Sequence, residues 1–161
     1  MKMNDIDEIR NLIASYGQVV DTFPRDPQRY ADHFVEDGSF TDCGVTLTPR
    51  TKILQLMEAA LSAESEAPPL SGTRHLQMNS VINVDGDFAL ATTQLMVIEL
   101  GEKGWRIRGS GQYTDDIVRD VDGRWRFKSK VVTWFKELGP DPLSPDLSAL
   151  YAGFFQSIMD S

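Results

Sequence analysis

Hydrophobic positions in the first third of the chain recur with the spacing of amphipathic helices. The longest run covers about residues 4 to 21, where apolar side chains lie three or four positions apart: Ile6, Ile9, Leu12, Ile13, Tyr16, Val19 and Val20. Asn4 is a suitable N-cap for this helix. A short second helix is expected after Asp26-Pro27 and a third after Thr48-Pro49, with a short strand, Ser39 to Cys43, between them.

From residue 73 onward the hydrophobic pattern changes from helical to extended. Before it, Ser62 to Gly72 contains two adjacent prolines and is expected to be a loop. Four long strands follow, at about Thr73–Val84, Phe88–Leu100, Trp105–Arg119 and Arg124–Phe135. Their short connections are rich in glycine, aspartate or both, which predicts an antiparallel meander. A proline-broken loop over residues 137–145 and an amphipathic helix from Asp146 to Met159 follow the last strand.

This order of elements predicts an α+β fold. We expect a single domain over residues 1–161, with its core at about 4–136 and the loop and C-terminal helix at 137–161. The curved antiparallel sheet is expected to form a half-open cone around the N-terminal helices. Such a concave, apolar space is where a small ligand binds by default.

Charge and composition exclude several kinds of partner. Hydrophobic residues make up 41% of the 161 residues, which is typical of one globular domain. The net charge of -8 disfavours binding to nucleic acid and to anionic membrane surfaces, since both require clustered cations. No apolar run is long enough to span a membrane, and residues 1–8 do not form a typical secretory signal. We therefore expect a cytoplasmic protein.

Metal and cofactor sites are not expected either. Cys43 is the only cysteine, so the chain can form neither an intramolecular disulfide nor a thiolate zinc cage. The acidic clusters lack the spacing of metal-binding loops, and the two histidines lie far apart in the sequence. We assign no metal ligand and no cofactor.

The two histidines differ in context. His33 lies in the predicted short second helix, between Asp32 and Phe34, and we interpret it as a surface or structural residue. His75 opens the first long strand, where alternate positions are polar. These polar positions form either a solvated face or the polar floor of an apolar pocket. Asp21 ends the first helix, where the macrodipole disfavours a carboxylate. It is either an exposed helix-end residue or the partner of His75.

Several short motifs, in this order, resemble those of a known superfamily. They are Tyr16-Gly17-Gln18-Val19-Val20-Asp21, Phe34-Val35-Glu36-Asp37-Gly38, Arg74-His75, Gly111-Gln112-Tyr113-Thr114-Asp115 and Asp122-Gly123-Arg124-Trp125-Arg126-Phe127. Over residues 4 to 136 the chain resembles SnoaL-like domains of the nuclear transport factor 2-like, or cystatin-like, superfamily. It is most similar to the branch of scytalone dehydratase, bile acid 7-alpha-dehydratase and hexachlorocyclohexane dehydrochlorinase.

The resemblance implies a cofactor-free lyase with an Asp–His pair. The pair falls on Asp21 and His75, and a tyrosine of the bile-acid enzyme falls on Tyr16. The remaining family positions carry different residues here, and we predict that these contact the substrate: Asp42, Thr93, Gln112, Thr114 and Trp134. We expect a hydrogen bond of at most about 3.2 Å between the Asp21 carboxylate and the imidazole of His75.

The predicted function is therefore elimination, of the dehydratase type, on a small cyclic or polycyclic hydrophobic compound. His75 is the predicted base, Asp21 orients it, and Tyr16 donates a hydrogen bond. Asp42 is a second acid if burial keeps it protonated. An isomerase or cyclase with the same proton shuttle is one alternative. A non-catalytic small-molecule-binding protein, or the small subunit of an oxygenase, is another.

The chain is also expected to form a homo-oligomer, a trimer or a dimer. The convex face of the sheet is predicted to carry apolar residues, among them Leu76, Met78, Ile82 and Val97. An open apolar face normally pairs with another subunit.

Overall fold

The computed structural model describes residues 4–22, 25–66, 72–135 and 153–160. It confirms the α+β class. The helices are α1 (Asp5–Asp21), α2 (Pro27–Ala31) and α3 (Arg50–Glu66). The strands are β1 (Phe34–Asp42), β2 (Val45–Leu47), β3 (Thr73–Asp85), β4 (Phe88–Gly101), β5 (Gly104–Arg119) and β6 (Trp125–Trp134). No helix within these described ranges is both long and apolar enough to cross a lipid bilayer.

Local sequence explains where the first two helices begin. The Asn4 side chain accepts a hydrogen bond from the backbone N–H of Asp7, which caps α1. Asp26 caps α2 in the same way, ahead of Pro27. Gly17 lies where α1 crosses β3, and a side chain at this position would collide with the Gln77 amide. A larger residue at this position would therefore require the flexible Gln77 side chain to move.

The six strands form one open sheet in the order β2-β1-β6-β5-β4-β3. β3 to β6 form the predicted antiparallel meander. β1, however, pairs in parallel with β6, so the sheet is mixed rather than wholly antiparallel. The reason is topological: more than eighty residues separate β1 from β6, and only strands joined by short turns are forced to be antiparallel. The end strands β2 and β3 do not pair with each other.

Several boundaries differ from the prediction. β1 begins at Phe34, ahead of the predicted Ser39, and β2 was not predicted. The two strands are joined by Cys43 and Gly44, which both have positive φ, as a tight hairpin turn requires. α3 continues to Glu66, into the predicted loop. Residues 153–159 are helical as predicted, whereas the expected beginning of that helix at 146–152 and the loop at 137–145 lie outside the described residues.

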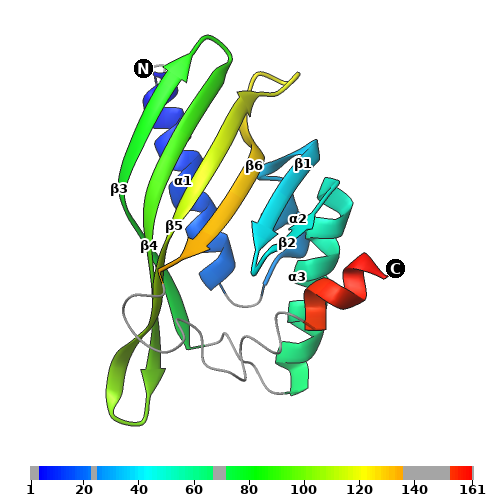
Figure 1. Ribbon diagram of the computed structural model, residues 1–161, viewed down its shortest axis with the longest axis vertical. Coiled ribbons are helices and arrows are strands. Elements are labelled where there is room, and N and C mark those ends of the chain that lie inside the picture. Colours follow the sequence, from blue (N-terminus) through cyan, green and yellow to red (C-terminus); the bar gives the residue numbers. More distant parts are fainter. Residues whose placement is uncertain (1–3, 23–24, 67–71, 136–152, 161) are drawn as a thin grey trace.

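The helices cover one face of the sheet, and the core lies between them and the sheet (Figure 1). α1 passes behind β3, β4 and β5 in this view, while α3 lies beside β1 and β2. The buried residues of α1 face the inner side of the meander: Ile9, Ile13, Tyr16, Gly17, Val19 and Val20.

One ion pair is completely buried within this core. Lys130 Nζ lies 3.0 and 3.1 Å from the two carboxylate oxygens of Asp115. Both side chains are 0% exposed. The ammonium also lies 3.9 Å from the ring centroid of Tyr113 and 4.5 Å from that of Tyr16. Burial raises the pKa of Asp115 and lowers that of Lys130, and in each case the attraction between the two charges opposes the shift.

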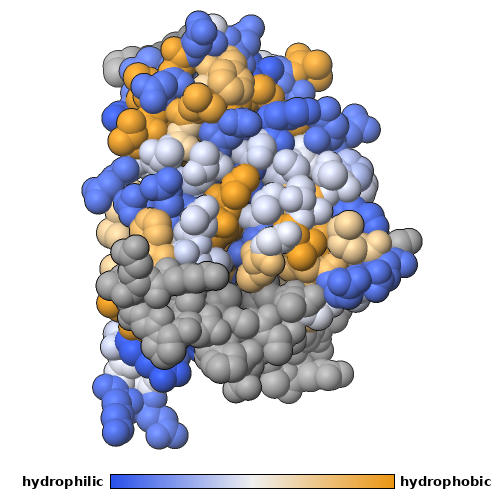
Figure 2. Space-filling view, in the orientation of Figure 1, coloured by the Kyte–Doolittle hydropathy of each residue, from blue (hydrophilic) through white to orange (hydrophobic). Residues whose placement is uncertain are grey.

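The outer face of the sheet is mixed in character. Leu76 and Met78 are exposed on it, as predicted. Val97 is not, because the alternation of β4 turns it toward the helices, where it is buried. Ile82 is not either, because a register shift between Met78 and Val81 reverses the faces of β3, so that Ile82 packs against the core. Figure 2 shows this face, on which pale and blue side chains separate smaller hydrophobic areas. Of the four residues predicted for this face, only Leu76 and Met78 are therefore exposed on it.

Replacing one member of the buried pair should destabilise the protein strongly. We expect Lys130→Met to lower the free energy of unfolding by about 3–5 kcal/mol, because it leaves the Asp115 carboxyl alone in the core. The double variant Lys130→Met/Asp115→Leu should recover most of this loss. Urea denaturation measures both changes.

The pH dependence supplies a control for that explanation. A carboxyl whose pKa is raised by folding costs stability only when it is ionised. The free energy of unfolding of Lys130→Met should therefore increase as the pH falls through the raised pKa of Asp115, and the double variant should lack this dependence. Equal destabilisation of the single and double variants would contradict the assignment.

We expect the exposed apolar residues of the outer face to support a homo-oligomer. Light scattering at micromolar concentration should give two or three times the chain mass of 18.1 kDa. Leu90→Arg, which replaces an exposed apolar side chain of β4 with a charged one, should lower the measured mass. A wild-type mass of one chain would exclude this expectation.

Candidate active site

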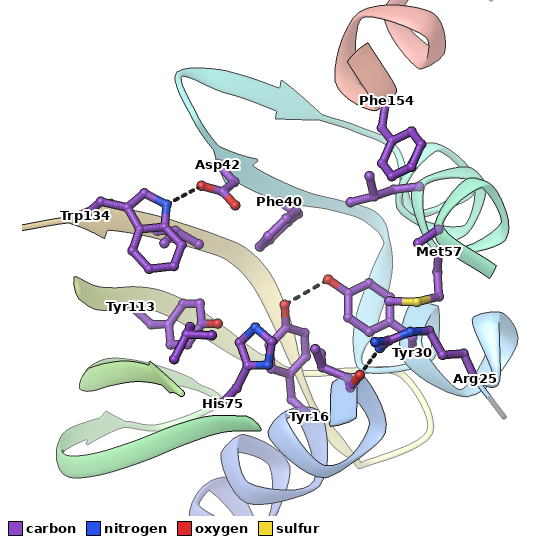
Figure 3. Close-up of a pocket in the computed structure, with 15 residues that line it drawn as sticks. Tyr16, Arg25, Tyr30, Phe40, Asp42, Met57, His75, Tyr113, Trp134 and Phe154 are labelled. Atoms are coloured by element: carbon purple, nitrogen blue, oxygen red, sulfur yellow. Dashed lines mark hydrogen bonds between the residues drawn. The ribbon is translucent and has the colours of Figure 1, made fainter. Parts of the chain in front are cut away.

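A mostly apolar cavity lies between the inner face of the sheet, α1 and α3. Figure 3 shows its lining side chains, which come from helices, five strands and the segment before α2: Tyr16, Val20, Arg25, Tyr30, Phe40, Asp42, Leu56, Met57, Ala60, His75, Val97, Tyr113, Val132, Trp134 and Phe154. Its volume is about 60 Å³. A cavity that holds a benzene ring measures about 150 Å³. Even a single-ring ligand therefore requires lining side chains to move.

His75 and Asp21 lie in direct contact at one side of this cavity. His75 Nδ1 is 2.7 Å from Asp21 Oδ1, which confirms the predicted hydrogen bond. The backbone N–H of His75 donates to the other oxygen, Oδ2, also at 2.7 Å. The carboxylate thus holds both the strand and the imidazole of His75, although 54 positions separate the two residues.

This contact determines which nitrogen of His75 carries a proton. A carboxylate only accepts hydrogen bonds, so Nδ1 must carry the hydrogen that it shares with Asp21. In the neutral ring, Nε2 then keeps a lone pair. Nε2 has no hydrogen-bond partner within the described part of the chain, and His75 lines the cavity. The arrangement supplies a proton acceptor whose tautomer and orientation are both set by Asp21.

Asp21 does not line the cavity itself. Together with His75 it borders an open groove between α1 and the outer edge of β3. Its two hydrogen bonds compensate a carboxylate at the C-terminus of α1, where the helix dipole disfavours negative charge. Asp21 can therefore act on a ligand only through His75.

Tyr16 lines the cavity, but its hydroxyl is already engaged. Tyr16 Oη lies 2.8 Å from the hydroxyl oxygen of Tyr30. Burial is the main cause that raises the pKa of Tyr16 well above its ordinary value, and the neighbouring Tyr30 and Tyr113 raise it further. The phenol therefore stays neutral and is suited to donating a hydrogen bond rather than to losing its proton.

Asp42 and Trp134 form a second polar group in the cavity. The indole Nε1–H of Trp134 donates to Asp42 Oδ1 at 2.8 Å, and the backbone N–H of Cys43 donates to the same oxygen at 2.7 Å. Burial raises the pKa of Asp42, whereas these hydrogen bonds and the charge of His75 oppose the shift. Two titratable groups, His75 and Asp42, thus border one small cavity (Figure 3).

The other predicted contact residues do not line the cavity. Gln112 and Thr114 flank Tyr113 on β5, so the strand alternation turns them to the outer face, where Gln112 pairs with Gln94. Thr93 faces inward but is fully buried and bonded to Ser80 at 3.0 Å. The prediction for Gln112 and Thr114 is corrected by the two-residue period of β5: because Tyr113 faces the cavity, the residues on either side of it face the other way.

Sequence reasoning missed several lining residues. Arg25, Tyr30 and Met57 all border the cavity. Tyr30 and Met57 stand at apolar positions of predicted helices, but the pattern does not show which core residues border a cavity. Buried Arg25 donates to the backbone carbonyl of Val20.

His33 has the predicted structural role. It bonds to Ser15 and to the backbone carbonyl of Arg29, each at 2.9 Å. Among the described residues, no group of three His, Cys, Asp or Glu side chains is placed to hold a metal ion.

The fold is shared with solved structures of low sequence identity. Rv3472, a protein of unknown function from Mycobacterium tuberculosis, superposes with a TM-score of 0.75 at 24% identity, over 96% of this chain and 88% of that one. ActVI-ORFA from Streptomyces coelicolor gives 0.64 at 23% identity, over 80% of this chain and 96% of its own. A protein from Novosphingobium aromaticivorans, provisionally named a scytalone dehydratase, gives 0.60 at 25% identity, over 81% and 84%.

No curated protein sequence matches the chain. The family model of the SnoaL-like domain matches residues 1–131, which is most of the 161-residue chain. The chain therefore belongs to the SnoaL-like domain family, which includes polyketide cyclases and dehydratases.

Proposed function

We propose that the protein is a cofactor-independent lyase that eliminates water from a small cyclic hydrophobic compound. The observation that carries this proposal is the hydrogen bond between Asp21 and His75, which leaves Nε2 as a proton acceptor beside an apolar cavity. Membership of a family with dehydratases supports the same chemistry. So does the similarity to the provisionally named scytalone dehydratase.

His75 would begin the reaction by taking a proton from the carbon next to an activating group, such as a carbonyl. The imidazolium that forms carries its charge beside Asp21, whose carboxylate stabilises it. Tyr16, oriented by Tyr30, would donate a hydrogen bond to the oxygen on which negative charge develops. The apolar walls exclude water, which strengthens these electrostatic effects.

The cavity limits the size of the substrate. Its volume of about 60 Å³ favours a one-ring or two-ring compound over a larger polycyclic one. Met57 is the most adaptable of the lining residues, because methionine is unbranched and flexible. Movement of such side chains would enlarge the cavity enough to hold a ring of the substrate.

An isomerase or cyclase remains the second candidate. The same His75 would move a proton between two carbons of the substrate, and no group would leave. Release of water, followed by mass spectrometry of the product, separates elimination from isomerisation. A non-catalytic binding protein or oxygenase small subunit would neither release water from the compound nor isomerise it.

Removing the base should abolish most of the turnover. We expect His75→Gln to lower kcat by about 10²- to 10⁴-fold, because glutamine cannot accept and release a proton. The assay uses a panel of one-ring and two-ring β-hydroxy ketones, whose dehydration is followed by ultraviolet absorbance. His33→Gln is the matched control and should keep wild-type kcat, since His33 lies outside the cavity lining. Full activity of His75→Gln would refute the mechanism.

The orienting carboxylate can be tested separately from binding. Asp21→Asn should lower kcat, because an amide can donate to Nδ1 and so place the imidazole proton on Nε2, the wrong nitrogen. Ligand affinity, measured by quenching of Trp134 fluorescence, should change much less, because Asp21 does not line the cavity. Trp134→Phe identifies the tryptophan signal. An equal loss of affinity and kcat would favour a structural role for Asp21.

Tyr16→Phe separates a hydrogen-bond donor from a core residue. If Tyr16 stabilises the developing oxyanion, kcat should fall by up to about 10³-fold. Tyr30→Phe also breaks the bond between the two hydroxyls but leaves the Tyr16 hydroxyl in place, so its effect should be smaller. Equal, small effects of both changes would assign the pair to the core alone.

A further inference from the structure

We propose that Asp42 is the proton donor to the leaving hydroxyl, with its transferable proton on Oδ2, across the cavity from His75. This inference rests on the proposed function and assigns the acid that the elimination requires. It also places the leaving group of the substrate at the Trp134 end of the cavity, and its acidic carbon–hydrogen bond at the His75 end.

The hydrogen bonds to Asp42 determine which oxygen carries the proton. Oδ1 accepts from the indole Nε1–H of Trp134, from the backbone N–H of Cys43 and, at 3.5 Å, from the Cys43 thiol. These groups are donors, so a proton on Oδ1 would face other hydrogens. The proton of the acid form therefore belongs on Oδ2, which has no hydrogen-bond partner within the described residues. Figure 3 shows this second oxygen turned away from the indole.

Burial of the Asp42 side chain favours its neutral acid form. Asp42 is 6% exposed and borders the same cavity as Phe40 and Val132. Burial is the largest influence on its pKa and raises it. Asp21, in contrast, has both oxygens in hydrogen bonds to His75 and does not line the cavity. The two carboxyl groups thus suit different roles, one as a charge and one as an acid.

The step balances with these two groups alone. His75 Nε2 takes the proton from carbon, the electron pair of that bond forms the carbon–carbon double bond, and the carbon–oxygen bond breaks. The departing hydroxide takes the proton of Asp42 and leaves as water. The cycle ends with His75 protonated and Asp42 ionised, two opposite charges that attract each other across the cavity. Transfer of the proton from His75 back to Asp42, through water, restores both groups.

The hairpin between β1 and β2 explains how the sequence holds Asp42 in place. Asp42 is the last residue of β1 and pairs with Val45 across the two-residue turn. Cys43 begins that turn with a φ of 50°, and its backbone N–H donates to Asp42 Oδ1. Trp134 reaches the same oxygen from the end of β6. Trp134 is therefore a positioning residue. Its N–H orients the Asp42 carboxyl and does not contact the reacting atoms.

The protonation state can be measured without a substrate. The indole N–H resonance of Trp134 reports the ionisation of Asp42, because the two groups share a hydrogen bond. We expect this resonance, assigned through its absence in Trp134→Phe, to titrate with a midpoint above the ordinary aspartic acid value of 3.8. The transition should vanish in Asp42→Asn and persist in Asp37→Asn, an exposed aspartate on the same strand. A midpoint at or below the ordinary value would overturn the proposal.

Turnover tests the catalytic role. With the β-hydroxy ketone that the wild type dehydrates fastest, Asp42→Asn should lower kcat at least about 10²-fold with little change in KM, and Asp37→Asn should not. kcat should fall as the pH rises through the pKa of Asp42, since the acid form is then lost. Trp134→Phe removes a bond that stabilises the carboxylate, so this decline should move to higher pH.

The outcomes separate the two proposals. If His75→Gln is inactive while Asp42→Asn keeps wild-type kcat, the lyase assignment stands and Asp42 is not the donor. If the wild type dehydrates no compound of the panel, the lyase assignment fails for this substrate class. The proposal that Asp42 donates a proton to the leaving hydroxyl is then overturned as well.

Discussion

The carboxylate of Asp21 joins the end of α1 to the first strand of the meander, and the geometry of the candidate site depends on that junction. One oxygen accepts from the backbone of His75 and the other from its ring. The backbone bond satisfies an N–H on β3, an edge strand of the sheet. The ring bond orients the imidazole and determines its tautomer. A single side chain therefore couples the packing of the helix on the sheet to the availability of Nε2.

Three aspartates of this small domain show how surroundings decide what a carboxyl group does. Asp21 is held as a charge by two donors on His75. Asp115 is fully buried, where it pairs with Lys130 and helps to hold β5 against β6. Asp42 accepts three hydrogen bonds on one oxygen and borders the apolar cavity, and its burial raises its pKa. Chemically identical groups thus serve as an orienting charge, a structural ion and a candidate acid.

The buried ion pair also connects the core to the cavity. Lys130 lies over the rings of Tyr16 and Tyr113, both of which border the cavity on their other side. The wall of the cavity is therefore backed by a charged group whose partner cannot move without exposing an unpaired charge. Such a rigid wall is consistent with a small cavity in which only the α3 side, with flexible Met57, adapts to a ligand.

The sequence by itself determined the order and type of the long elements, because hydrophobic period and turn residues are local properties. α1, the four strands of the meander and the turns between them follow from it closely. The family resemblance added the pairing of Asp21 with His75. Only the tertiary structure decided the parallel pairing of β1 with β6, the burial of Lys130 beside Asp115, and the convergence of Asp42 with Trp134, 92 positions away. These contacts join segments that are distant along the chain, and no local pattern records which of them will meet.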